Sequence, residues 1–278
     1  MKVASFVRGG RAAWGVVVDG GVIDATSLHP TLKAALAAGA LGQVGSWAAG
    51  RRPDAALDAV EWLPVVPDPG KVWCCGLNYG EHVRETNNQV TERPTFFTRW
   101  ADAQVGHGAA MLRPRESEQL DFEGEIAVVI GRGGRRIAEA DAAAHVAGYA
   151  CFNDGSVRDW QRHTSQFAPG KNFWRSGAFG PWMVTADEVP FGTTMTLVTR
   201  LNGREVQRAT TEMMIHSIAR QIAYVSTVAP LEPGDVIVTG TPGGVGARRT
   251  PPLWMKAGDV VEVEVDRIGV LRNPIADE

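Results

Sequence analysis

The decapeptide DFEGEIAVVI, residues 121–130, places three acidic side chains directly before an unbroken apolar run. A short run of aliphatic and β-branched residues predicts a strand buried in a core. Because residues two apart in a strand point to the same face, we expect Glu123 and Glu125 to project side by side, with Asp121 above them. Carboxylates in such a row repel one another unless solvent or a cation compensates their charge. An isolated pair of this kind is more often a solvated strand face, but the core strand that follows favours a site.

Another acidic residue follows a second predicted strand. Residues 146–152 read VAGYACF, and Asn153, Asp154 and Gly155 come directly after them. With Glu123 and Glu125, Asp154 would complete an oxygen-only set of ligands, which suits Mg²⁺ or Mn²⁺ rather than zinc. The alternative is an Asx turn between Asp154 and Gly155. Spacing alone leaves these two interpretations even.

The composition is that of a globular protein with many turns. The 278 residues include 28 basic and 31 acidic side chains, a net charge of −3 that gives no electrostatic footprint for nucleic acid. The content of 32 Gly and 16 Pro favours a β-rich fold over a helix bundle. Three cysteines without a zinc-type spacing fit a reducing compartment. Because neither a signal peptide nor a membrane span is recognisable, we expect a cytoplasmic protein with no membrane partner.

The order of the expected elements indicates two unequal domains. Short strands and two Ala-rich helices precede a proline-rich passage at residues 63–70, which predicts a small N-terminal domain over residues 1–68. Over residues 69–278 strands outnumber helices and do not alternate with them, which predicts an α+β, β-dominated fold rather than a doubly wound sheet. One long amphipathic helix is expected over residues 213–228, with His216 inside it.

A histidine and a glutamate form the first candidate catalytic pair. His82 and Glu85 lie three residues apart on a short helix expected over residues 80–85, and therefore on one face. A carboxylate that holds one ring nitrogen fixes the tautomer and leaves the other nitrogen as a base toward water. On its own, such a pair is more often a surface ion pair.

Basic and polar candidates follow Asp154 along the chain. Arg158 and Gln161 share one face of an expected helix, and the guanidinium fork suits a planar carboxylate. Lys171 offers a point charge for an anion, although each of these residues taken singly is more often a surface residue. The stretch TGTPGGVG, residues 239–246, matches neither a P-loop nor GxGxxG, so nucleotide binding is not expected. A backbone nest for a carboxylate is the remaining interpretation of this stretch.

Taken together and in order, these motifs resemble the fumarylacetoacetate hydrolase family over about residues 70–273. The matching segments are GLNY with His82 and Glu85 at 76–85, DFEGE at 121–125, the stretch 153–161, Gly170 with Lys171, Gly180 with Pro181, and the stretch 233–246. Each segment alone is weak, but six in the right order are specific.

The resemblance implies a C-terminal catalytic domain folded as a mixed β-sandwich roll, with a small N-terminal α/β domain, in a homodimer. It also implies a bound Mg²⁺ or Mn²⁺ ion. The roles that it implies for single residues are metal ligands for Glu123, Glu125 and Asp154, catalytic residues for His82, Glu85 and Lys171, and substrate contacts for Arg158, Gln161 and Thr241.

Two positions depart from the family's pattern. Gly155 stands where a bulkier residue is usual, and Arg99 stands where many relatives carry lysine. We expect both departures to affect substrate choice, and neither to touch the metal ligands.

The residues and the resemblance together predict a metal-dependent hydrolase acting on a C–C bond. Its substrate would be a small 2-oxo acid, an acylpyruvate such as fumarylpyruvate or maleylpyruvate, cleaved to pyruvate and a carboxylic acid in the catabolism of aromatic compounds. One alternative is an oxaloacetate decarboxylase, or a hydratase or isomerase of 2-oxo acids, that works through the same metal-stabilised enolate. The other alternative is a non-catalytic dicarboxylate-binding protein.

Overall fold

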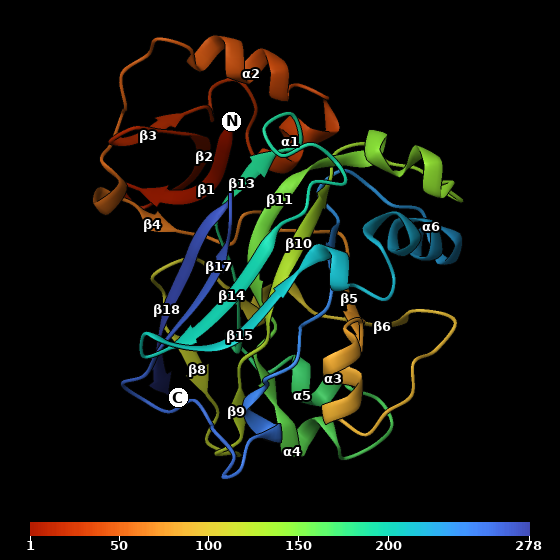
Figure 1. Ribbon diagram of the computed structural model, residues 1–278. Helices are drawn as coiled ribbons and strands as arrows, with labels where there is room; N and C mark the ends of the chain where they lie inside the picture. The colour runs from red at the N-terminus through yellow and green to blue at the C-terminus, as the bar shows by residue number, and fades with distance from the viewer.

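The computed structural model describes residues 1–278, and most of its regular structure is strand (Figure 1). The largest sheet has 11 strands. The main path across it runs β3 (Gly21–Asp24), β2 (Arg11–Val18), β1 (Lys2–Arg8), β13 (Gly177–Thr185), β11 (Val146–Asn153), β10 (Gly124–Ile130), β16 (Val236–Val238), β5 (Val72–Gly76) and β6 (Thr95–Thr98). Two short strands pair off this path, β4 (Glu61–Trp62) with β1 and β7 (Gln104–Val105) with β13.

A second sheet of five strands packs against the first. Its order is β15 (Arg204–Thr210), β14 (Thr196–Leu201), β17 (Val260–Val265), β18 (Gly269–Asp277) and β8 (Met111–Arg113). A separate pair joins β9 (Leu120–Asp121) to β12 (Ser156–Val157). The mixed sheets confirm the prediction of a β-dominated α+β fold.

The helices are short. They are α1 (Leu32–Ala37), α2 (Leu41–Ala48), α3 (Gly80–Glu85), α4 (Arg158–Gln161), α5 (Ala168–Lys171) and α6 (Ile218–Val228). Single 3₁₀ turns occur at η1 (Leu57–Ala59), η2 (Ala101–Ala103), η4 (Thr211–Met213) and η5 (Gly246–Arg248), with a longer one at η3 (Glu139–His145). None of these helices combines the length and the apolar character needed to cross a membrane.

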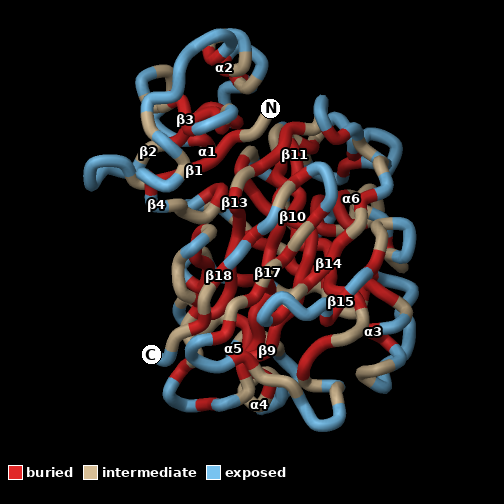
Figure 2. The backbone as a smooth tube through the Cα atoms, turned by 60° about the vertical axis from the view of Figure 1, so that its left-hand side comes forward, coloured by how far each residue is buried: buried red, intermediate tan, exposed pale blue.

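Strand β10 is buried on both faces, which explains its unbroken apolar sequence (Figure 2). Ile126 and Val128 pack into the core between the two sheets, where they meet side chains of β14, β17 and β18. Ala127 and Val129 point the opposite way, into a second core that includes apolar residues of α1 and α2. The strand that carries the acidic motif is therefore fixed between two cores.

The N-terminal segment continues the large sheet through β1. Lys2 and Val3 of β1 pair antiparallel with Val184 and Met183 of β13. Strands β1–β4 and helices α1 and α2 lie at one end of the molecule, and helices α3, α4 and α5 gather at the other end (Figure 1). The division into domains at residue 68 stays a prediction.

The long helix predicted over residues 213–228 begins later than expected. Helix α6 starts at Ile218, with Ser217 as the N-cap whose side chain accepts from the backbone N–H of Arg220. His216 therefore lies before the helix and not inside it. Its backbone N–H donates to Oδ1 of Asn78 at 2.7 Å, a partner 138 residues away that competes with a helical bond.

Candidate functional site

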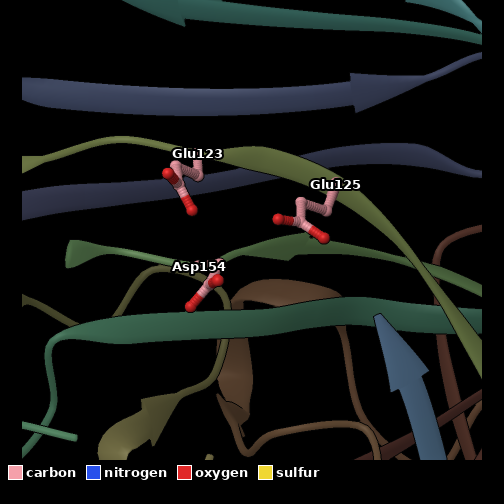
Figure 3. Close-up of side chains that lie close together, drawn as sticks. All are labelled: Glu123, Glu125 and Asp154. Carbon is pink, nitrogen blue, oxygen red and sulfur yellow. The ribbon is translucent and has the colours of Figure 1, made fainter. Parts of the chain in front are cut away.

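Three carboxylates meet at the ends of β10 and β11. Glu123 comes directly before β10, Glu125 is its second residue, and Asp154 follows β11. Because Gly124 pairs with Asn153 and the N–H of Asp154 donates to the carbonyl of Glu123 at 2.8 Å, the antiparallel register brings the acids together. One oxygen from each lies within 4.8 Å of the others, and all three side chains are buried. Figure 3 shows the three side chains close together, with Glu123 and Glu125 above Asp154 in the view.

Buried cations compensate two of these carboxylates. Nζ of Lys171 lies 2.5 Å from Glu123 and 2.7 Å from Asp154. Nη2 of Arg158 lies 2.6 Å from the other oxygen of Glu123. Burial alone would raise the pKa of Glu123, but Arg158 and Lys171 outweigh it and hold that pKa far below its usual value. Burial would lower the pKa of Lys171, but Asp154 and Glu123 raise it, so this lysine stays a cation.

Glu125 lacks such a cation. The N–H of Gly240 donates to its Oε2 at 2.6 Å, and no group of the protein donates to its Oε1. Burial, followed by the charges of Asp154 and Glu123, raises its pKa well above the usual value. An ion with two positive charges would compensate this carboxylate, and the all-oxygen donor set fits Mg²⁺ or Mn²⁺. The residues present therefore fit a hard divalent cation.

The His82–Glu85 pair lies at the same cavity. Nδ1 of His82 is 2.8 Å from Oε1 of Glu85, and the second oxygen of Glu85 accepts the N–H of Gly244 at 2.9 Å. Glu85 is thus fixed from two sides and orients the imidazole. With Nδ1 engaged, Nε2 is the ring nitrogen left to take a proton.

The glycine-rich stretch that follows β16 is a nest for carboxylates of the protein itself. Its amides donate to Glu125 from Gly240 and to Glu85 from Gly244. The N–H groups of Gly246 and Ala247 both donate to Asp121, at 2.8 and 2.9 Å. The sequence predicted a carboxylate nest, and these bonds show that it positions acidic side chains of the site.

One cavity of about 380 Å³ brings the predicted residues together. Its lining includes every predicted site residue except Glu85, which reaches it through His82: His82, Glu123, Glu125, Asp154, Arg158, Gln161, Lys171 and Thr241. Gln161 accepts from Nη1 of Arg158 at 2.8 Å, and the hydroxyl of Thr241 donates to the carbonyl of Gly124 at 3.0 Å. The volume is in the range of small-molecule sites.

The expectation that Arg99 does not touch the metal-binding set is wrong, because its guanidinium binds the carboxylate of Asp154. Nη1 of Arg99 pairs with Asp154 directly and donates to the carbonyl of Gly155 at 2.8 Å, and Nη2 donates to Oγ of Ser176 at 3.0 Å. A Cβ at Gly155 would lie 1.9 Å from the carbonyl oxygen of Ser176. Close backbone packing, and not access for a substrate, is therefore what requires glycine here.

Sequence reasoning missed two further residues that hold the site. Asp121 binds Nε of Arg158 at 2.8 Å and so aims this arginine at Glu123. Gln207 of β15 accepts from the N–H of Gly124 at 3.0 Å and donates to Thr241 at 2.9 Å. The position of Asp121 in the acidic motif was a signal for it. Gln207 lies 83 residues from Gly124 and carries no local signal.

Comparison with known families gives one match over most of the chain. The family described as fumarylacetoacetate (FAA) hydrolase C-terminal matches residues 71–276. A mitochondrial oxaloacetate tautomerase of Bos taurus is 39% identical over 264 residues, which cover 92% of this chain and 84% of the relative.

Solved structures share the whole fold. The maleylpyruvate hydrolase of Sphingobium sp. SYK-6, solved with manganese (II) ion and pyruvate, is 28% identical with a TM-score of 0.83, covering 100% of this chain and 99% of that one. A 5-carboxymethyl-2-hydroxymuconate delta-isomerase from Mycobacterium smegmatis is 29% identical with a TM-score of 0.79 and full coverage of both chains (100% and 100%). Proteins of this fold thus include a hydrolase and an isomerase.

Proposed function

The chain belongs to the fumarylacetoacetate hydrolase family, and on that premise we propose that it is a metal-dependent hydrolase that cleaves an acylpyruvate to pyruvate and a carboxylic acid. The observation that carries this proposal is the convergence, on one cavity, of three buried carboxylates with a histidine held by a glutamate. The proposed substrate is a small 2-oxo acid that is formed in the breakdown of aromatic compounds. The proposed assembly is a homodimer.

Glu123, Glu125 and Asp154 would hold Mg²⁺ or Mn²⁺. The ion supplies Lewis-acid stabilisation of negative charge on the oxygens of the 2-oxo acid. Lys171 and Arg158 place positive charge beside the same carboxylates. Their hydrogen bonds to Glu123 already fix them, so they need no reorganisation during the reaction.

His82 has the geometry of a general base. Its Nε2 would take a proton from water, whose oxygen attacks the carbonyl carbon remote from the carboxylate of the pyruvyl end. The bond between this carbon and the adjacent methylene carbon then breaks, and its electron pair remains on the pyruvyl fragment as an enolate. The proton held at Nε2 can return to the methylene carbon, which gives pyruvate and leaves His82 neutral.

Gln161 and Thr241 are placed to orient the substrate. The Oε1 of Gln161 accepts from Arg158, so its Nε2 is available to donate into the cavity. Thr241 already donates to Gly124 and accepts from Gln207, so it would contribute a fixed oxygen rather than a mobile hydroxyl.

Release of pyruvate, coupled to lactate dehydrogenase, tests the reaction. With Mn²⁺ and fumarylpyruvate or acetylpyruvate, we expect Glu123→Ala to abolish turnover and His82→Gln to lower kcat by about 10²–10⁴-fold. Glu85→Gln should lower kcat less, because the imidazole remains but loses its orienting carboxylate. His145→Gln, remote from the cavity, is the control. If Glu123→Ala and His82→Gln both keep wild-type turnover, the proposed site is wrong.

Tautomerisation of oxaloacetate is the second candidate, favoured by the identity to the mitochondrial oxaloacetate tautomerase. It needs the same enolate but no water, so His82 would only move a proton between carbon and oxygen. The decay of the enol's ultraviolet absorbance measures tautomerisation, and carbon dioxide release measures decarboxylation. If kcat/KM for tautomerisation or for decarboxylation far exceeds kcat/KM for the hydrolysis of every acylpyruvate, that reaction replaces hydrolysis as the proposed function. Binding of a dicarboxylate without any turnover would leave only a binding protein.

A further inference from the structure

Two arginines at the mouth of the cavity have no acidic partner. Arg162, the residue that ends α4, and Arg248, the last residue of η5, both line the cavity and are exposed. Neither forms an ion pair, and their only side-chain hydrogen bond runs from Nη2 of Arg248 to the carbonyl of Thr86 at 3.4 Å. By contrast, Arg99 and Arg158 within the site are tied to carboxylates. The mouth therefore presents two guanidinium groups whose donors remain available.

The two arginines repel each other more than either nearby carboxylate, that of Asp121 or that of Asp159, attracts Arg162. Partial burial, followed by the charges of Arg248 and Arg158, lowers the pKa of Arg162. Like charges that face one cavity repel each other, and an anion between them relieves that repulsion. The planar fork of each guanidinium matches a carboxylate in two-bond geometry.

The cations in the inner part of the site are already bound to carboxylates of the protein. The site's four carboxylates, Asp121, Glu123, Glu125 and Asp154, face three cations, Arg99, Arg158 and Lys171. None of these three cations is therefore free to bind the far end of a substrate. The two mouth arginines are left for a second anionic group.

We propose that Arg162 and Arg248 form a second anion subsite that takes the distal carboxylate of a 2-oxo dicarboxylate. The inference rests on the proposed function, because it assumes that the 2-oxo acid end of the substrate lies at the three carboxylates. It narrows the substrate class from any acylpyruvate to those with a carboxylate at the far end of the acyl chain, and it applies whether the bond is hydrolysed or the substrate only isomerised.

The kinetic test compares a diacid with a monoacid. We expect the wild-type protein to prefer fumarylpyruvate to acetylpyruvate in kcat/KM. Combining Arg162→Gln with Arg248→Gln should lower this ratio about tenfold or more, mainly through KM, since a charge-assisted pair contributes roughly a factor of ten in affinity. Arg11→Gln removes an exposed arginine at the start of β2 and should leave the ratio unchanged. An unchanged ratio in the double variant would overturn the subsite.

Binding without chemistry separates the subsite from the reaction. Calorimetry on the Mn²⁺-loaded protein would compare 2-oxoadipate with 2-oxohexanoate, which have the same chain length and differ in the distal carboxylate. We expect the diacid to bind about tenfold more tightly, with the advantage lost in the double variant and reduced by added salt. If this preference holds but no acylpyruvate is turned over, the proposed reaction is wrong and the subsite stands. Equal affinity for both acids refutes the subsite, and binding of neither refutes both proposals.

Discussion

Asp154 shows how far a single residue of this site depends on partners from elsewhere in the chain. Its carboxylate meets Lys171 on one oxygen and Arg99 on the other. Arg99 is 2% exposed and also binds Gly155 and Ser176, so it fixes the turn that follows β11. The arginine therefore acts as a positioning residue for one member of the carboxylate cluster.

Two substitutions of Arg99 should separate the contribution of its charge to stability from that of its guanidinium hydrogen bonds. Arg99→Met leaves Asp154 buried with one cation fewer, and we expect it to cost about 3 kcal/mol of unfolding free energy. Arg99→Lys keeps the charge but loses the fork that reaches Gly155 and Ser176, so a loss of about 1 kcal/mol is expected. Urea denaturation of the metal-free proteins measures both. A methionine variant as stable as the lysine variant would contradict this role.

A second prediction at this scale concerns Gly155. Alanine there would force its Cβ to within 1.9 Å of the carbonyl oxygen of Ser176, so the backbone must move, at a cost of roughly 1–3 kcal/mol. The matched control is Gly42→Ala in α2, where a Cβ meets nothing within 4 Å and should stabilise the helix by up to about 1 kcal/mol. Thermal unfolding of the two variants should therefore shift in opposite directions.

At the scale of elements, the local sequence pattern predicted the strands and helices whose positions depend on the segment itself. The apolar run of β10 and the short helix α3 appear where they were expected, because hydrophobicity and its periodicity are properties of the segment itself. The start of α6 was missed because Asn78, from a distant loop, binds the backbone of His216. Sequence pattern does not show a partner 138 residues away.

The same limit applies to the site. Similarity in motif order was enough to name its candidate residues, and the antiparallel register of β10 and β11 explains why they converge. The contact of Arg99 with Asp154, 55 residues apart, depends on where β6 ends, which no local pattern reports. Supporting contacts are therefore the part of the site that only the fold reveals.

The loop between β7 and β8 gives a pH-dependent prediction. Nδ1 of His107 accepts the N–H of Arg272 in β18 at 3.1 Å, which requires the neutral ring. Burial and then the charge of Arg272 lower the pKa of His107, so the unfolded chain binds this proton more readily than the folded one. The contribution is present above the unfolded pKa of about 6.5 and is lost as the pH falls below it.

Urea unfolding between about pH 7.5 and 5.5 measures this contribution. We expect the wild-type protein to lose stability as the pH falls through this range. His107→Gln keeps an acceptor for Arg272 but cannot be protonated, so its free energy of unfolding should fall less over the same pH range. An equal pH dependence of the two proteins would show that His107 does not contribute.

At the scale of the whole molecule, the carboxylate cluster joins parts that are far apart in sequence. Its acids come from the centre of the large sheet, and its cations come from α4, α5 and the segment after β6. A divalent cation bound there would hold these parts together in the folded state only. At a concentration 100 times its Kd, such an ion adds about 2.7 kcal/mol to the free energy of unfolding.

Glu125→Gln should change the metal-free and the metal-loaded protein in opposite directions. Without metal, the variant replaces a carboxyl group whose ionised form burial, Asp154 and Glu123 disfavour, and it keeps an acceptor for Gly240, so we expect a higher melting temperature than wild type. Millimolar Mg²⁺ or Mn²⁺ should raise the melting temperature of wild type by several degrees. It should raise that of the variant little, because a ligand oxygen is lost. Glu205→Gln on the exposed face of β15 is the control and should gain as wild type does. If metal raises the melting temperature of Glu125→Gln as much as that of wild type, the ion binds elsewhere. Calorimetric titration with the metal would then give the same stoichiometry and affinity for the variant as for wild type.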